Sequence, residues 1–131
     1  MKYLLDTHAL IWALTETGKL SKTVKNILVK SDDQVIVSTI SFWEISLKYS
    51  LGKLDLGGLL PDQFPDACLD TGFEILNLEM DTSSTYHQLK AHHKDPFDRM
   101  LIWQAISNRY TLISDDDNIK NYTSEGLKVV W

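Results

Sequence analysis

Residues 2–14 read KYLLDTHALIWAL and combine the two patterns that decide the fold. Lys2–Leu5 is a short, mostly apolar segment of the kind that forms a buried strand, and Asp6 follows it directly. The next stretch, His8–Leu14, is almost wholly apolar and has the length of about two helical turns. The chain therefore begins with an expected strand, an acidic residue at the strand's end and an expected helix.

The same alternation of short strands and helices continues along the chain. Further strands are expected at Val35–Val37, Phe73–Leu78, Thr111–Ser114 and Lys128–Trp131. Helices are expected at residues 21–30, 41–51, 62–70, 81–91 and 96–110, with a short helix or turn at 115–122. This order is typical of right-handed βαβ units. We therefore expect an α/β fold with one parallel sheet of four to five strands, covered by helices on both faces.

Length and composition restrict the class of protein. A chain of 131 residues predicts a single domain over residues 1–131. With 44% hydrophobic and 24% charged residues, it is neither disordered nor fibrous. The longest apolar run, Ala9–Leu14, has six residues and is far too short to span a membrane. The sequence has no signal-peptide pattern and one cysteine, Cys68, so we expect a cytoplasmic protein without an internal disulfide.

The charge balance is acidic. Eighteen acidic residues against 13 basic ones give a net charge of −5, the wrong sign for holding nucleic acid by overall charge. Contact with a nucleic acid would therefore need a local basic strip. The candidates for it are Lys48, Lys53, Lys90, Lys94 and Arg99.

Four acidic residues fall where the carboxyl ends of the expected strands meet. Asp6 follows the first strand, and Glu44 lies in the first turn of the helix expected after the second. Asp98 lies in the first turn of the helix that begins at Pro96, and Asp116 comes two residues after the fourth strand. In open α/β sheets this edge is where ligands bind. The four acids are therefore the candidate site.

The first two acids also have purely structural interpretations. Asp6 could be the N-cap of the helix that follows it. Glu44 fits a capping box with Ser41, and it stands four residues before Lys48, the spacing of a favourable helical ion pair.

The same alternative applies to the other two. Asp98 could complement the dipole of its own helix, with Asp95 as the N-cap. Asp116 lies inside the run Asp115–Asp117, and such runs are often solvated loops. What sets the four apart is their shared place at one edge of the expected sheet.

Carboxylates brought together at such an edge require compensation. Two of them about 5 Å apart repel by roughly 3 kcal/mol at an effective dielectric constant near 20. A hard divalent cation relieves this repulsion, and oxygen-only ligands select Mg²⁺ or Mn²⁺ over zinc. Such an ion orients phosphate oxygens and activates water. Because the sequence has no GxSxG, HExxH or glycine-rich phosphate loop, we expect metal-assisted hydrolysis of a phosphodiester or phosphomonoester.

Several motifs together resemble the PIN-domain family, in particular its VapC-type toxins from bacterial toxin–antitoxin pairs. These are LLDTHALIWAL at residues 4–14, SxxSFWEISLKxxLGKL at 38–54, HHKDPFDRMLIWQA at 92–105, TLISDDD at 111–117 and VVW at 129–131. The resemblance runs from Tyr3 to Trp131, and DPFDR with the following helix is its most specific part.

The resemblance implies a metal-dependent ribonuclease with a three-layer α/β/α sandwich. It implies that Asp6, Glu44 and Asp98 are the principal acids around Mg²⁺ or Mn²⁺, and that Asp116 in the Ser114–Asp116 element is the fourth. Asp115 or Asp117 could replace Asp116 if the turn shifts. It further implies an RNA substrate, a homodimer and a cognate antitoxin that enters the cleft.

Other functions remain open at this point. A non-catalytic module that binds RNA or protein could keep the same fold, and a DNA nuclease or phosphatase could use the same acids. Three tryptophans, Trp12, Trp43 and Trp103, are expected in the core or an interface. His92 and His93 are expected in a solvated loop, with contact to substrate phosphates as the alternative.

Overall fold

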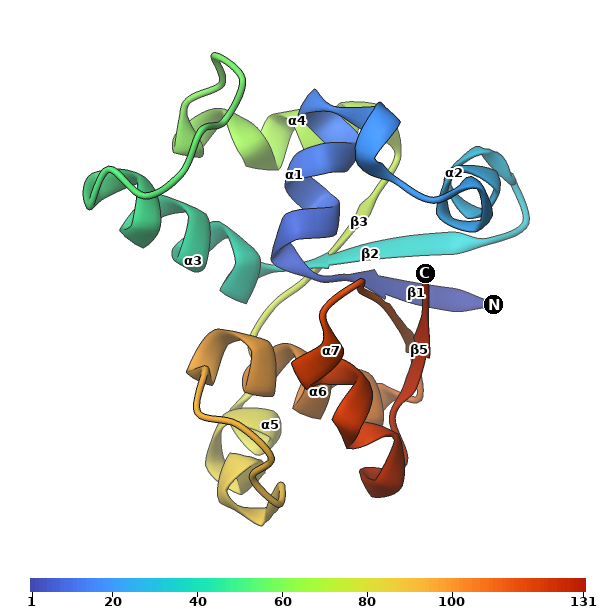
Figure 1. Ribbon diagram of the computed structural model, residues 1–131, viewed down its shortest axis with the longest axis vertical. Coiled ribbons are helices and arrows are strands. Elements are labelled where there is room, and N and C mark those ends of the chain that lie inside the picture. Colours follow the sequence, from blue (N-terminus) through green and yellow to red (C-terminus); the bar gives the residue numbers. More distant parts are fainter.

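A parallel sheet of five strands forms the centre of the molecule in the computed structural model, which describes residues 1–131 (Figure 1). The strands are β1 (Lys2–Leu5), β2 (Gln34–Ser38), β3 (Glu74–Leu76), β4 (Thr111–Ile113) and β5 (Lys128–Val130). Their order in the sheet is β3-β2-β1-β4-β5. Leu4 of β1 pairs with Ile36 on one side and with Leu112 on the other. The prediction of one parallel sheet of four to five strands is confirmed.

Seven α-helices connect the strands. They are α1 (Thr7–Thr15), α2 (Lys22–Val29), α3 (Thr39–Ser50), α4 (Phe64–Thr71), α5 (Met80–Thr85), α6 (Pro96–Asn108) and α7 (Asp117–Lys120). Short 3₁₀ turns lie at Thr17–Lys19, Pro61–Gln63, Tyr86–Gln88 and Asn121–Glu125. None of the helices combines the length and the apolar composition needed to cross a membrane.

The helices cover both faces of the sheet, because successive strand residues point to opposite sides. Leu5 packs into one core with Leu10 of α1 and Phe64 of α4. Leu4 packs into the other core with Leu101 and Ile102 of α6. In Figure 1 α1, α2 and α4 accordingly lie on one side of the strands, and α5, α6 and α7 on the other. The expected three-layer α/β/α sandwich is confirmed.

The helix expected at residues 81–91 is shorter than predicted. It ends at Thr85 and passes into the 3₁₀ turn. The hydroxyls of Ser83, Ser84 and Thr85 donate to the carbonyl oxygens of Met80 and Asp81 in the preceding turn. Side chains that bond to their own backbone in this way compete with the helical pattern, which explains the early end.

The strand order places a topological switch point between β1 and β4. From β1 the chain continues to β2 and β3 on one side, whereas β4 and β5 lie on the other. The ends of β1 and β4 adjoin directly, because the amide of Asp6 donates to the carbonyl oxygen of Ile113 at 3.0 Å. Ligands in open α/β sheets bind at this kind of point, outside the carboxyl ends of the strands.

Candidate active site

Asp6 directly follows β1, Asp116 lies three residues after the end of β4, and each is the N-cap of the helix that follows. The Asp6 carboxylate accepts from the amide of Ala9 at 2.8 Å, and 5% of Asp6 is exposed. The Asp116 carboxylate accepts from the amide of Asn118 at 2.8 Å. The amide of Asp116 is in turn held by the hydroxyl of Ser114 at 3.1 Å. Capping fixes the direction of both carboxylates and leaves one oxygen of each free of the cap bond.

Glu44 lies in the second turn of α3 and not in the first, as the sequence led us to expect. The N-cap is Ser38, whose hydroxyl accepts from the amide of Ile40 at 3.1 Å. The predicted capping box between Ser41 and Glu44 is therefore wrong. Ser38 takes this role because its hydroxyl is already fixed at the end of β2, where it donates to the side chain of Gln104 in α6 at 2.6 Å.

The Glu44 carboxylate is buried and has two protein partners. Thr7, the first residue of α1, donates its hydroxyl to Glu44 Oε1 at 2.6 Å. Lys48, one turn further along α3, forms an ion pair with Oε2 as the spacing predicted. The hydroxyl of Ser41 lies 3.1 Å from that of Thr7. Glu44 is thus tied to the element that begins directly after Asp6.

Asp98 lies in the first turn of α6, as predicted. Asp95 is the N-cap and accepts from the amides of Phe97 and Asp98 at 2.9 and 3.1 Å. Asp98 is therefore not needed as a cap, and its Oδ2 lies 3.2 Å from Nε2 of His93.

Burial raises the pKa of Asp6 from 3.8 to about 6. Hydrogen bonds from Ser114 and from the amide of Ala9 oppose the rise, as does the charge of His8, whereas the charge of Asp116 adds to it. An acid with such a pKa is destabilised in its ionised form. A cation placed against it would therefore be favoured.

The pKa of Asp98 also rises from 3.8 to about 6. Burial is the main cause, and the charges of Asp95, Asp116 and Glu44 contribute, while the hydrogen bond with His93 opposes them. Asp116 therefore acts electrostatically on both Asp6 and Asp98. The charges of acids from separate segments of the chain therefore contribute to the raised pKa of Asp98.

Asp115 and Asp117 are placed differently from Asp116. Both face Lys120, with N···O distances of 3.6 and 3.7 Å, and the Asp117 side chain is almost fully exposed. Asp115 nevertheless lines a pocket of about 260 Å³ together with Asp6, His8, Trp12 and Asp116. Among the three acids of the run, Asp116 is the one whose charge contributes to the raised pKa of both Asp6 and Asp98.

Lys48 interacts electrostatically with Glu44, Asp95 and Asp98. Its burial lowers its pKa, but the hydrogen bond and charge of Glu44, together with Asp95 and Asp98, outweigh this and raise the pKa overall. Arg99, in contrast, donates to the Tyr86 hydroxyl and to the carbonyl oxygen of Leu89, both at 2.9 Å. Its guanidinium is therefore occupied within the fold. The prediction that Arg99 contacts a nucleic acid is not supported by this position.

The donor set fits a hard cation that keeps part of its water shell. No three His, Cys, Asp or Glu side chains lie close enough together to hold a metal ion by themselves. Asp6 and Asp116 line one pocket, whereas Glu44 and Asp98 are not among the residues that line it. Mg²⁺ commonly binds through one or two carboxylates and several waters, and this arrangement suits such an ion better than a fully protein-enclosed one.

Sequence reasoning missed the surroundings of His93. The buried hydroxyl of Tyr122 accepts from the amides of His92 and His93 at 3.0 and 3.2 Å, and lies 2.9 Å from Nδ1 of His93. The expectation of a solvated loop is therefore wrong for His93. Its position two residues before Asp95 was a usable signal, but the partner Tyr122 lies 29 residues away along the chain.

The tryptophans also differ from one another. Trp43 is 60% exposed and meets the ring of Phe97 edge-on, with centroids 5.0 Å apart. Trp43 therefore lies outside the core, and its expected place in an interface stays a prediction. Trp12 and Trp103 are partly buried and pack against opposite cores, as expected.

Fold and site together define an α/β protein with a carboxylate-lined rim at the switch point of a parallel sheet. Residues 3–124 match the PIN domain family, and the chain belongs to that family. No curated protein sequence is similar enough to count as a relative.

Solved structures of toxin–antitoxin complexes share this fold. VapBC2 from Rickettsia felis, bound to a DNA fragment from its promoter, matches with a TM-score of 0.71 at 19% identity, covering 100% of this chain and 99% of that one. VapBC-1 from nontypeable Haemophilus influenzae matches with a TM-score of 0.67 at 16% identity, covering 99% of this chain and 97% of that one. DNA-bound VapBC from Salmonella typhimurium matches with a TM-score of 0.66 at 17% identity, covering 99% of this chain and 97% of that one.

Proposed function

We propose that this protein is a metal-dependent endoribonuclease that acts as the toxin of a toxin–antitoxin pair. The observation that carries the proposal is that Asp6 and Asp116 line one pocket where β1 and β4 adjoin. Burial, the main cause, raises the pKa of Asp6 and of Asp98 to about 6, and the charge of Asp116 adds to both shifts. Membership of the PIN domain family and the shared fold with VapBC complexes support the proposal.

Asp6 and Asp98 would hold the ion, Mg²⁺ or Mn²⁺, and Glu44 and Asp116 would hold it through water. When bound, such an ion polarises a phosphate and lowers the pKa of a bound water from about 15.7 toward neutrality. Both direct ligands have a pKa near 6, so each is mostly ionised and ready to bind at pH 7 and above.

The remaining residues orient water and neutralise charge. Glu44 or Asp116 would position the attacking water and accept its proton as the water oxygen bonds to phosphorus. The P–O bond to the leaving oxygen of the RNA breaks, and that oxygen takes a proton from solvent. Thr7 keeps Glu44 in place through the 2.6 Å hydrogen bond. The charge of Lys48 compensates Glu44 and reaches Asp98 as well, so it would limit repulsion when the phosphate arrives.

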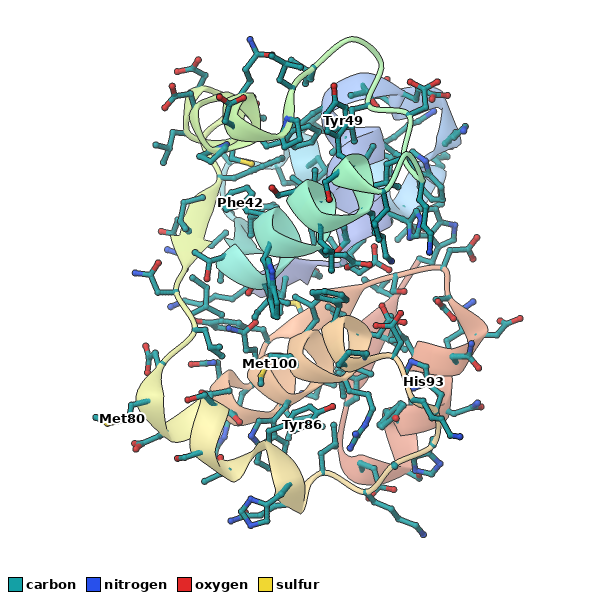
Figure 2. The ribbon with its side chains drawn as sticks, turned by 90° about the vertical axis from the view of Figure 1, so that its left-hand side faces the viewer. Phe42, Tyr49, Met80, Tyr86, His93 and Met100 are labelled. Carbon is teal, nitrogen blue, oxygen red and sulfur yellow. The ribbon has the colours of Figure 1, made fainter.

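Protein partners are part of the proposal. We expect a homodimer and a cognate antitoxin, in the cytoplasm. The outer face of α3 suits a protein partner, since Trp43, Leu47 and Tyr49 are exposed there. Beside it a groove of about 520 Å³ runs between α3 and the segment at Leu60–Pro65, and Figure 2 shows Phe42 and Tyr49 along this helix.

The test is a cleavage assay with single-stranded RNA, single-stranded DNA and a chromogenic phosphomonoester, each with Mn²⁺ and with chelator. We expect cleavage of RNA only, and only with the ion. Asp6→Asn and Asp98→Asn should each lower the rate by about 100-fold or more, because each removes a charged ligand without changing the side-chain shape. Asp70→Asn, an exposed acid on α4, should leave the rate unchanged.

Other outcomes would point to the alternatives. Preferential cleavage of DNA or of the monoester would replace the ribonuclease by a DNA nuclease or phosphatase. RNA binding without turnover under all conditions would indicate a non-catalytic module. Full activity of both Asp→Asn variants would contradict the proposed site.

A further inference from the structure

The hydroxyl of Tyr122 is the centre of a hydrogen-bond network beside Asp98. Tyr122 lies in the 3₁₀ turn Asn121–Glu125 and is completely buried. Its oxygen has three partners, which are the amides of His92 and His93 and the Nδ1 atom of His93. The opposite nitrogen of the same imidazole ring, Nε2, lies 3.2 Å from Asp98 Oδ2.

Counting hydrogens assigns the direction of each bond. The two amides can only donate, so they use the two lone pairs of the Tyr122 oxygen. The single hydrogen of the hydroxyl is then left for Nδ1 of His93. A neutral imidazole that accepts at Nδ1 carries its hydrogen on Nε2, and this hydrogen points to Asp98. The opposite tautomer would place three donors on one oxygen and leave the buried hydroxyl hydrogen without an acceptor.

We propose that His93 is a positioning residue, which donates from Nε2 to Asp98 and thereby orients this carboxylate toward the acidic rim, with its tautomer fixed by Tyr122. The role rests on the proposed function, because it assigns to Asp98 the task of holding the ion. Partners of this kind, which orient a metal ligand from behind, typically change ion affinity by about 10–100-fold.

The surroundings make His93 rigid enough for this role. The ring of Tyr122 is met edge-on by the rings of His92 and His93, with centroids 4.8 and 5.4 Å apart. His92 in addition bonds Glu125 at 2.9 Å, so two adjacent histidines attach this loop to the turn at Asn121–Glu125. Figure 2 shows His93 beside the C-terminal helical segment, in the loop that leads into α6.

The same network links two acids of the site. The turn that contains Tyr122 follows directly on α7, whose N-cap is Asp116. Through His93 the start of α6 is therefore attached to the element that positions Asp116. This attachment connects the segments that carry Asp98 and Asp116, which lie 18 residues apart in sequence.

Nuclear magnetic resonance of the metal-free wild-type protein tests the tautomer directly. Long-range ¹H–¹⁵N spectra distinguish a protonated Nε2 from a protonated Nδ1. We expect His93 to carry its hydrogen on Nε2, and Tyr122→Phe to allow both tautomers. A wild-type His93 protonated on Nδ1 would overturn the inference, and this measurement requires no substitution that could unfold the chain.

Two substitutions of His93 separate positioning from simple packing. The amide of His93→Gln reaches about as far as Nε2 and can still donate to Asp98, whereas that of His93→Asn reaches only to the place of Nδ1. Isothermal titration with Mn²⁺ should show affinity within about threefold of wild type for His93→Gln and a loss of about 10–100-fold for His93→Asn. His92→Gln, which touches Tyr122 but no acid of the rim, is the matched control and should bind as wild type does.

The outcomes are distinct. Equal affinities for His93→Gln and His93→Asn would overturn the positioning role, whether both match wild type or both lose the ion. If the wild-type protein takes up no Mn²⁺, the proposed function fails and the positioning role fails with it, while the tautomer still stands as measured. If the wild type binds Mn²⁺ and only His93→Asn is weakened, the inference holds.

Discussion

At the scale of single residues, ionisation of Asp6 costs the folded protein stability. Its pKa is about 6 in the folded state and 3.8 as the ordinary value. The proton is therefore lost from the unfolded chain first, and the contribution of Asp6 to stability falls as the pH rises from about 4 to 6. A difference of this size corresponds to about 3 kcal/mol at pH 7.

We predict that Asp6→Asn stabilises the metal-free protein at pH 7 by about 2–3 kcal/mol and changes little at pH 4. The asparagine can still accept the bond from Ala9 as an N-cap, so only the charge is removed. Urea unfolding of both proteins at several pH values measures this. If Asp6→Asn lowered the free energy of unfolding equally at pH 4 and pH 7, the ionised carboxylate of Asp6 would not be destabilised in the folded state.

For the ion pair between Glu44 and Lys48 we predict a loss of stability, in contrast to the gain predicted for Asp6→Asn. Lys48→Met leaves the buried Glu44 charge without its partner and should destabilise the protein by about 2 kcal/mol at pH 7. The double variant Glu44→Gln/Lys48→Met should recover most of this loss, because no unpaired charge remains. Urea unfolding compares the two with Lys53→Met, an exposed control expected near wild type. Failure of the double variant to recover would mean that Lys48 acts through packing alone.

At the scale of elements, three helical segments end on a residue with left-handed backbone. Gly72 ends α4 at φ 91° and Gly126 ends the last 3₁₀ turn at φ 95°, whereas α6 ends on Arg109 at φ 59°. A side chain is unfavourable in this conformation.

We predict that Arg109→Gly stabilises the protein by about 0.5–1 kcal/mol. Arg109 is exposed and has no ion pair, so little is lost. Thermal unfolding should show a midpoint about 3 °C higher. Arg109→Ala, which keeps the strain, is the control, and a glycine variant no more stable than the alanine variant would contradict the prediction.

Elements also show how much the sequence could predict. Asp6 and Asp116 were placed correctly because the carboxyl ends of adjacent parallel strands adjoin whatever the side chains are. The start of α3 differs from the prediction: Ser38 is the N-cap, and its hydroxyl also donates to Gln104, 66 residues away along the chain. The role of Tyr122, which also bonds to a residue far along the chain, could not be predicted. Contacts that are set by packing between distant elements leave no local pattern.

At the scale of the whole molecule, a chain of net charge −5 must meet RNA through a limited basic surface. Lys48 is paired with Glu44 and Arg99 is bound within the fold, which leaves Lys53, Lys90 and Lys94 as exposed candidates. About three phosphate contacts on single-stranded RNA give a salt exponent near −2.

We therefore predict that cleavage at low RNA concentration falls about 10–20-fold between 50 and 200 mM salt. The double variant Lys90→Gln/Lys94→Gln should show a weaker dependence, and Lys25→Gln on α2 should not differ from wild type. Initial rates over this salt range measure the exponent. A rate independent of salt would exclude a basic strip as the route of RNA binding.

In the proposed site, acids from separate segments serve one ion at the switch point. Mn²⁺ binding followed by electron paramagnetic resonance, on wild type, Asp6→Asn, Asp98→Asn and the double variant, tests it most directly. We predict one set of sites that either substitution weakens strongly, with a double variant little worse than the single ones, because both carboxylates hold the same ion. Independent, additive losses from the two substitutions, or no loss from either, would contradict the account.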